Sequence, residues 1–263
     1  MKRLLPIAAA ILFASSAFAG MTYKVQSATS GFRSVTMLGT VTVDGSRMRM
    51  DISNGDKLLF KDNSIVFSTD GGKTMTVVDP STKTYYEMQL DQLISGAGSL
   101  LKGNPMIKIS FENPKVTVRD GGDGGTIEGY PTHKSTLDAS YDIVIDAMGT
   151  QMTSHMQMTT ESWTTDQLSS EFSNFLQAKN MRTGVEALDK LIEAQSTALK
   201  GFPLKQISSV KTNQNGRDMT MTTTATVTDI VKKDIDAAQF TLPDGYTKVD
   251  DPLSKMVKGL QTR

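Results

Sequence analysis

Methionine is the residue type whose pattern in this sequence could support unusual chemistry. The chain has 16 Met and no Cys, and Met152, Met156 and Met158 stand close together around His155. Thioether sulfur is a soft ligand that selects copper(I), so a copper(I) site is one hypothesis. Successive side chains of a β-strand point to opposite faces, which turns His155 away from the three Met residues. The sequence therefore predicts no metal site, and copper(I) binding stays a third alternative.

The residue types needed for catalysis do not form a recognisable motif. His133 and His155 are the only histidines, and no Gly-x-Ser-x-Gly or phosphate-binding glycine loop occurs. Asp142 and Asp146 resemble a paired-carboxylate site, but a glycosidase pair needs a cleft between the two groups. Solvated charges on an outer face are the simpler interpretation. We expect a protein that is not an enzyme and has no cofactor.

The remaining interpretation of the methionines is apolar packing. Met is flexible and polarizable, and it suits both irregular cores and surfaces that accept varied apolar shapes. Plain core and ligand-lined cavity both remain open. If there is a cavity, its predicted lining is Met37, Met48, Met50, Met152, Met156, Met158, Met219 and Met221.

The elements that would position these residues are mainly strands. Alternation over Val35–Val43 ends at Asp44-Gly45, which is typical of a hairpin turn. The strongest alternation, over 217–230, places Met and Val on one face of the strand and a row of Thr on the other. One face of the sheet is therefore expected to be exposed to solvent. The sequence predicts an up-and-down meander, with the glycine run over 121–125 as a turn. The other predicted strands cover Arg47–Met50, Lys57–Phe60, Ser64–Ser68, Thr74–Val78, Thr84–Met88, Ile107–Phe111, Val116–Val118, Ser140–Met148, Gln151–Trp163 and Leu204–Thr212.

Helices are expected where apolar residues recur at helical spacing. One helix is predicted over Leu90–Leu101, two more over 168–176 and 185–199, and an amphipathic one after Asp251. The predicted fold is mostly β with α (α+β): a curved antiparallel half-barrel sheet packed around a few helices. The predicted division is a signal peptide (1–19), a single half-barrel domain with inserted helices (20–250) and a C-terminal helix (251–263).

The first residues predict export. Lys2 and Arg3 precede a short apolar run, and Ala17-Phe18-Ala19 is a small-x-small cleavage site before Gly20. The chain has 28 Lys+Arg and 28 Asp+Glu, without a basic stripe that would suit nucleic acid. No later segment is long and apolar enough to span a bilayer. The expected location is the periplasm, and the sequence does not predict an oligomeric state.

Short motifs along the chain resemble a known family. The sequence is similar to domain of unknown function 4412 in the segments Met48–Asp51, Val78-Asp79-Pro80, Lys83–Met88, Gly129-Tyr130, Trp163 and Phe240–Tyr246. That family in turn resembles the LolA/LolB-like periplasmic lipoprotein-carrier fold, an open antiparallel half-barrel with helices at its mouth. The resemblance implies binding of a hydrophobic ligand or a lipoprotein, and it assigns no residue a role.

Three functions are therefore expected in order of preference. The first is a non-enzymatic periplasmic binding or carrier protein for a hydrophobic ligand, either an acyl chain or a lipoprotein. The second is an interaction or assembly protein of the envelope with a solid core. The third is a periplasmic copper(I)-binding protein.

Overall fold

The computed structural model describes residues 20–31, 34–55, 60–89, 107–168, 185–186, 189–190, 192–194, 200–214 and 217–251. The predicted signal peptide, the helix over Leu90–Leu101 and the helix after Asp251 lie outside these residues. Most of the helices predicted over 168–176 and 185–199, and residues 57–59 of the strand predicted over Lys57–Phe60, lie outside them too. Phe60 itself is not in a strand.

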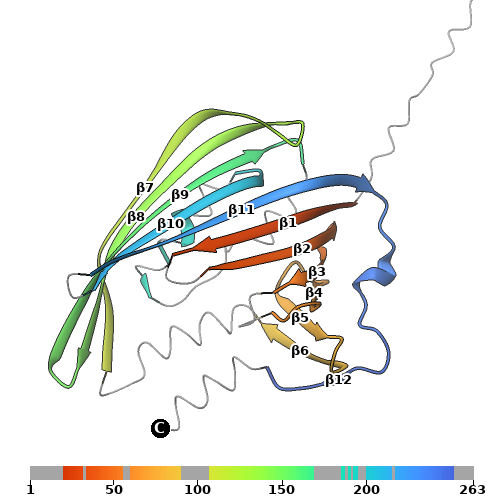
Figure 1. The fold of residues 1–263 in the computed structure, drawn as a ribbon, viewed down its shortest axis with the longest axis horizontal. Coiled ribbons are helices and arrows are strands. Elements are labelled where there is room, and N and C mark those ends of the chain that lie inside the picture. The colour runs from red at the N-terminus through yellow and green to blue at the C-terminus, as the bar shows by residue number, and fades with distance from the viewer. Residues whose placement is uncertain are drawn as a thin grey trace, which may run out of the picture.

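A single open sheet gathers every strand of the described chain, in the order β12-β6-β5-β4-β3-β2-β1-β11-β10-β9-β8-β7. Figure 1 shows that the sheet is twisted and curved, with the longest strands in its second half. The strands are β1 (Gly20–Ser30), β2 (Val35–Asp44), β3 (Arg47–Asn54), β4 (Ile65–Ser68), β5 (Thr74–Asp79), β6 (Thr84–Gln89), β7 (Ile107–Ile127), β8 (Tyr130–Ala147), β9 (Thr150–Thr165), β10 (Phe202–Gln214), β11 (Arg217–Lys233) and β12 (Thr247–Lys248).

Two meanders make up this sheet. Strands β1 to β6 form one, and β7 to β11 form the other. They join where β1 pairs antiparallel with β11, from Gly20 opposite Lys233 to Ser30 opposite Thr222. The predicted meander is confirmed within each half. It is wrong at one point, because β6 and β7 follow each other in sequence but lie towards opposite edges of the sheet.

The predicted α+β class overstates the helix content. Among the described residues, helix is confined to positions 186, 189–190 and 192–194 and to the short 3-10 helix η1 (Ala237–Phe240). The fold of the described chain is therefore mostly β. Long antiparallel ladders pair the backbone N–H and C=O groups of these strands.

The glycine run over 121–125 is not the predicted turn, because it lies inside β7. The register of β7 against β8 shifts there and again at Asn113-Pro114, where proline cannot donate to the ladder. Gly124 allows close packing, since a Cβ at this position would lie 2.8 Å from Cδ1 of Trp163. The glycines therefore make bulges that bend a long edge strand.

The chain after β11 forms a C-terminal strap, residues 234–251. Arg47 of β3 lies over the Phe240 ring at 5.0 Å, and Arg49 donates to the Gln239 carbonyl at 3.0 Å. The strap then pairs parallel with the edge strand, Thr247 opposite Thr84. The motifs around Arg49, Thr84 and Phe240 are thus joined in space, although they are far apart in sequence (Figure 1).

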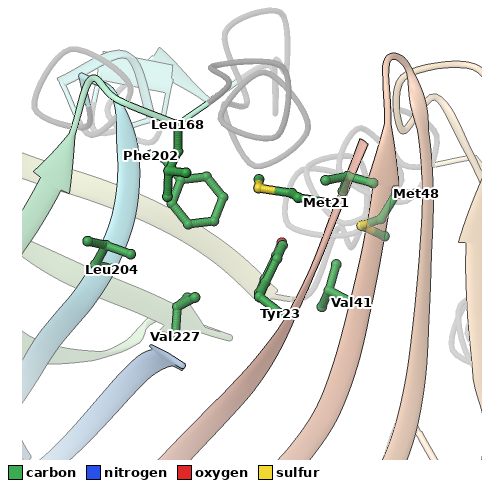
Figure 2. Packing of buried hydrophobic residues seen from close by; sticks show 9 residues of the cluster. Met21, Tyr23, Val41, Met48, Leu168, Phe202, Leu204 and Val227 are labelled. Atoms are coloured by element: carbon green, nitrogen blue, oxygen red, sulfur yellow. The ribbon is translucent and has the colours of Figure 1, made fainter. Parts of the chain in front are cut away.

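The main hydrophobic core lies on one face of the sheet. Tyr23 of β1 and Phe202 of β10 meet edge to face with ring centroids 5.4 Å apart, although β11 runs between their strands. Strands separated by one neighbour are about 9.6 Å apart, so these side chains converge across a bent sheet. Figure 2 shows the cluster, which also contains Met21, Val41, Val43, Met48, Leu168, Leu204 and Val227.

Candidate functional site

The face that carries Tyr23 and Phe202 is called here the inner face, and the strand registers define it over the rest of the sheet. Met158 of β9 is opposite Val210 of β10, which is opposite Met221 of β11. Met158 is also opposite Ala139 of β8. Because side chains alternate along each strand, the inner positions of β8 to β11 follow from these pairs.

At one end the inner face is packed solid. Phe202 and Leu204 are fully buried, and Tyr23 and Val227 are buried almost completely. Burial raises the pKa of the Tyr23 hydroxyl well above its ordinary value. This end, called here the packed base, leaves its side chains little contact with water.

A belt of hydroxyl groups crosses the inner face beside the packed base. Thr160 of β9 and Ser208 of β10 share a hydrogen bond of 3.1 Å, and Thr29 of β1 and Thr223 of β11 share one of 2.9 Å. The neighbouring row has Gln206 Nε2 donating to Ser162 Oγ at 3.3 Å. Buried hydroxyls are costly unless they are hydrogen-bonded, so these pairs stabilise a polar strip inside an apolar face. The hydroxyl belt comprises Thr29, Ser135, Thr160, Ser162, Gln206, Ser208 and Thr223.

Beyond the belt the inner face is mostly apolar but stays accessible, with Ser154 and Thr212 as polar residues at two of its inner positions. Met152 and Met219 are 42% and 40% exposed, and Met156, Met158 and Met221 are half-buried. Tyr141 and Ile145 of β8 lie opposite Met156 and Met152. Partial burial raises the pKa of Tyr141 too. This region, called here the methionine patch, comprises Tyr141, Ile143, Ile145, Met152, Met156, Met158, Val210, Met219 and Met221.

The structure separates the eight methionines predicted as a lining into two groups. Met152, Met156, Met158, Met219 and Met221 come together in the methionine patch across β9, β10 and β11. The other three lie on β2 and β3, on the same inner face but elsewhere. Met48 is 6% exposed within the main core, Met50 packs against two core clusters, and Met37 packs beside the core around Ile52.

On β8 and β9, Asp138, Asp142 and His155 lie on the outer face, away from both the belt and the patch. His155 Nδ1 lies 2.6 Å from the Asp142 carboxylate on the outer face, and Asn113 donates to the same carboxylate at 2.7 Å. The hydrogen bond from Asn113, followed by that from His155, lowers the pKa of Asp142. His155 is therefore separated from the methionine thioethers by the sheet, as the alternation predicted. No group of three or more His, Cys, Asp or Glu that could hold a metal ion occurs within the described ranges.

A second polar group on the outer face surrounds Asp138. The Asp138 carboxylate accepts a hydrogen bond from the Thr159 hydroxyl at 2.9 Å and one from Arg119 Nε at 3.0 Å. These contacts lower the pKa of Asp138. Nearby, the Nζ atoms of Lys134 and Lys205 each lie 4.8 Å from the centre of the Trp163 ring. The inner positions of β8 to β11 from the belt to the patch carry no charged residue. The sheet therefore separates an ionic outer face from a neutral inner one.

Sequence reasoning identified the methionines but missed the hydroxyl belt. The signal was present in β9, where the inner positions change from Met156 and Met158 to Thr160 and Ser162 without any break in alternation. It was hidden because Thr and Ser occur on both faces of these strands. Only the register shows which hydroxyls share a face.

The chain matches one family model and has distant similarity to several solved structures. The family model described as a domain of unknown function (DUF4412) matches residues 32–246, whereas no curated protein matches the sequence. The chain is similar to the solved LolA superfamily protein NE2245 from Nitrosomonas europaea, at 10% identity and a TM-score of 0.32 over 86% of this chain and 91% of that one. It is also similar to a DUF1329 family protein from Desulfovibrio piger, at 8% identity and a TM-score of 0.32 over 86% of this chain and 91% of that one. The structure of PNGF-II matches at 13% identity and a TM-score of 0.35 over 92% of this chain and 33% of that one.

Proposed function

This chain belongs to the DUF4412 family, and we propose that it is a non-enzymatic periplasmic carrier that binds the acyl chain of a lipid or lipoprotein in an open half-barrel. The observation that carries the proposal is the methionine patch, an accessible and uncharged apolar region on the inner face of a curved sheet. A carrier of this kind needs an apolar surface large enough for a chain and no chemistry on the ligand.

The size of the patch supports an acyl chain as the occupant. Met152 and Met158 are six positions apart on β9, which corresponds to about 20 Å along a strand. The hydrocarbon core of a bilayer is about 30 Å thick, so the chains of one leaflet take up about 15 Å. One acyl chain therefore fits along the patch, and its burial replaces water on Met152 and Met219.

The chemistry of methionine supports the same occupant. A thioether chain is flexible and polarizable, so a surface built from it adapts to apolar chains of different shape. The inner positions of β8 to β11 between the belt and the patch carry no charged residue, which avoids the desolvation cost that a buried charge would add. In the described part of the chain no helix is both long and apolar enough to cross a membrane.

Binding can be tested with protein purified from its own periplasm. Native mass spectrometry is expected to show a larger mass before delipidation than after it, and an apolar fluorescent dye is expected to bind the delipidated protein. The double variant Met219→Gln/Met221→Gln is expected to weaken dye binding several-fold. The matched control is Thr220→Gln/Thr222→Gln, on the opposite face of the same strand. Equal masses and no dye binding would refute the carrier function.

A second candidate is an envelope interaction or assembly protein with a solid core. The packed base supports it, because Phe202, Leu204 and Tyr23 leave no accessible space at that end. The same dye experiment separates the two functions. A solid-core protein binds no dye at the methionine patch, and its Met219→Gln/Met221→Gln variant behaves like the control.

A further inference from the structure

We infer that the ligand is an amphiphile with an uncharged, hydrogen-bonding head group, whose head contacts the hydroxyl belt while its acyl chain covers the methionine patch. The inference rests on the proposed function and specifies its ligand class. Its basis is the order of three zones on one face: packed base, hydroxyl belt and methionine patch.

The belt retains hydrogen-bonding capacity after its internal bonds are counted. Each Ser or Thr hydroxyl has one donor and two acceptor sites. The pairs Thr29–Thr223 and Thr160–Ser208 use one bond each between two hydroxyls. The remaining acceptor sites suit a hydroxyl or amide head, and rotation of a hydroxyl hydrogen lets the belt donate to an ester carbonyl. The half-buried positions of Thr29, Ser208 and Thr223 leave these groups within reach of a ligand.

Charge excludes the other head groups. Among the described inner positions from the belt to the patch there is no Lys or Arg, so a carboxylate or phosphate brought to the belt would lose water without gaining a cation there, which is costly. Lys134 and Lys205, each adjacent in sequence to a belt residue, place their Nζ atoms over the Trp163 ring on the outer face. An ammonium head would likewise meet no Asp or Glu at the described inner positions from the belt to the patch, and Asp138 and Asp142 are engaged on the outer face.

The belt also gives the inner face a direction. An acyl chain alone would gain nothing from lying near the belt, since burying hydroxyls under hydrocarbon has a cost. A polar head placed there removes that cost and leaves the chain on the patch. The belt therefore fixes the orientation of a bound amphiphile, with its head group at the belt and its acyl chain on the methionine patch.

The test compares three amphiphiles with the same saturated chain and different head groups. Monododecanoylglycerol is neutral, dodecanoate is an anion and dodecyltrimethylammonium is a cation. Their affinities for the purified protein are measured by displacement of the apolar dye, below the concentrations at which they form micelles. The neutral ligand is expected to bind about tenfold more tightly than either ion, a difference of about 1.4 kcal/mol.

The possible outcomes separate this inference from the carrier function. Equal affinity for all three ligands, or preference for an ion, overturns the neutral-head inference and leaves the carrier function standing. Failure of all three ligands and of the dye to bind refutes the carrier function itself.

Variants of the belt test where the head group is recognised. Thr29→Val/Thr223→Val removes both members of one pair, so no single hydroxyl is left without its partner. It is expected to reduce the preference for the neutral head over either ion to about threefold or less. Thr222→Val/Thr224→Val, on the outer face of β11, is the matched control and keeps the full preference. If the belt variant is unstable, Thr160→Val/Ser208→Ala removes the other hydroxyl pair as a whole, and an unchanged preference in the stable variant overturns the inference.

Discussion

The packed base and the methionine patch lie on the same face of the same sheet, yet one is closed and the other accessible. Phe202 of the base has no exposed surface, whereas Met219 of the patch is 40% exposed. Both regions arise from regular alternation of apolar side chains. The difference is that strands from the two halves of the sheet converge at the base, where Tyr23 meets Phe202. Alternation therefore decides which face is apolar, and sheet curvature decides whether that face is filled.

The largest effect is expected from truncation at the base. Phe202→Ala removes a fully buried ring that contacts Tyr23, and such changes cost about 3–5 kcal/mol. The free energy of unfolding, measured by urea denaturation, should fall by this amount. Met219→Ala in the patch should change it by less than about 1 kcal/mol, since part of that side chain is already in water. Equal losses in the two variants would contradict the distinction between base and patch.

The second effect concerns alkaline pH. Burial raises the pKa of Tyr23 in the folded protein, so above the unfolded value of about 10 the folded state holds a proton that the unfolded chain releases. The stability that this group contributes is fully present below about pH 10. It falls as the pH rises towards the folded pKa, by up to about 1.4 kcal/mol per pH unit.

The Tyr23→Phe variant isolates this contribution. Its free energy of unfolding should fall less steeply above about pH 10 than that of the unmodified protein. Tyr141→Phe, in the patch, should change the slope less, because Tyr141 is only half-buried. Identical slopes of the unfolding free energy against pH for all three proteins would show that burial does not raise the pKa of Tyr23.

The hydroxyl belt should show an intermediate effect. Thr160→Val keeps the shape of the side chain but removes the hydroxyl that bonds Ser208, which should cost about 1 kcal/mol of unfolding free energy. Thr153→Val, at an exposed outer position of β9, serves as the control with little change. A Thr160→Val protein more stable than the original would mean that the belt pair contributes nothing to folding.

The smallest effect on stability is expected from oxidation of the methionines, but its rate should differ clearly between the patch and the core. Susceptibility of methionine to sulfoxide formation follows exposure. Peptide mass spectrometry after mild peroxide treatment should find Met152 and Met219 oxidised well before Met21 and Met48, which are 4% and 6% exposed. Bound ligand should slow the oxidation of the patch residues and leave the oxidation rate of the core residues unchanged. Uniform oxidation, or a patch that stays unprotected in the ligand-loaded protein, would contradict the proposed binding surface.

Much of the strand pattern could be predicted from local sequence. The turn at Asp44-Gly45 and the alternation from Met219 to Val227 both match the structure, because turn chemistry and side-chain alternation are local properties. The glycine run over 121–125 misled for the same reason. Glycine favours turns when considered alone, but here the ladder with β8 and the packing of Trp163 on Gly124 hold it in a strand.

The sequence by itself determined which side chains share a strand face, and with them the methionine clusters and the position of His155 away from the thioethers. The tertiary structure decided the pairing of β1 with β11, the closing contact of the strap on Arg47 and Arg49, and the alignment of hydroxyls from several strands into one belt. The physical reason is that the first properties are local in sequence, whereas the others depend on residues far apart in sequence. Alternation follows from the geometry of a single strand, whereas a belt exists only once the register between strands is set. Curvature then separates the methionines that are buried as core from those that remain open to a ligand.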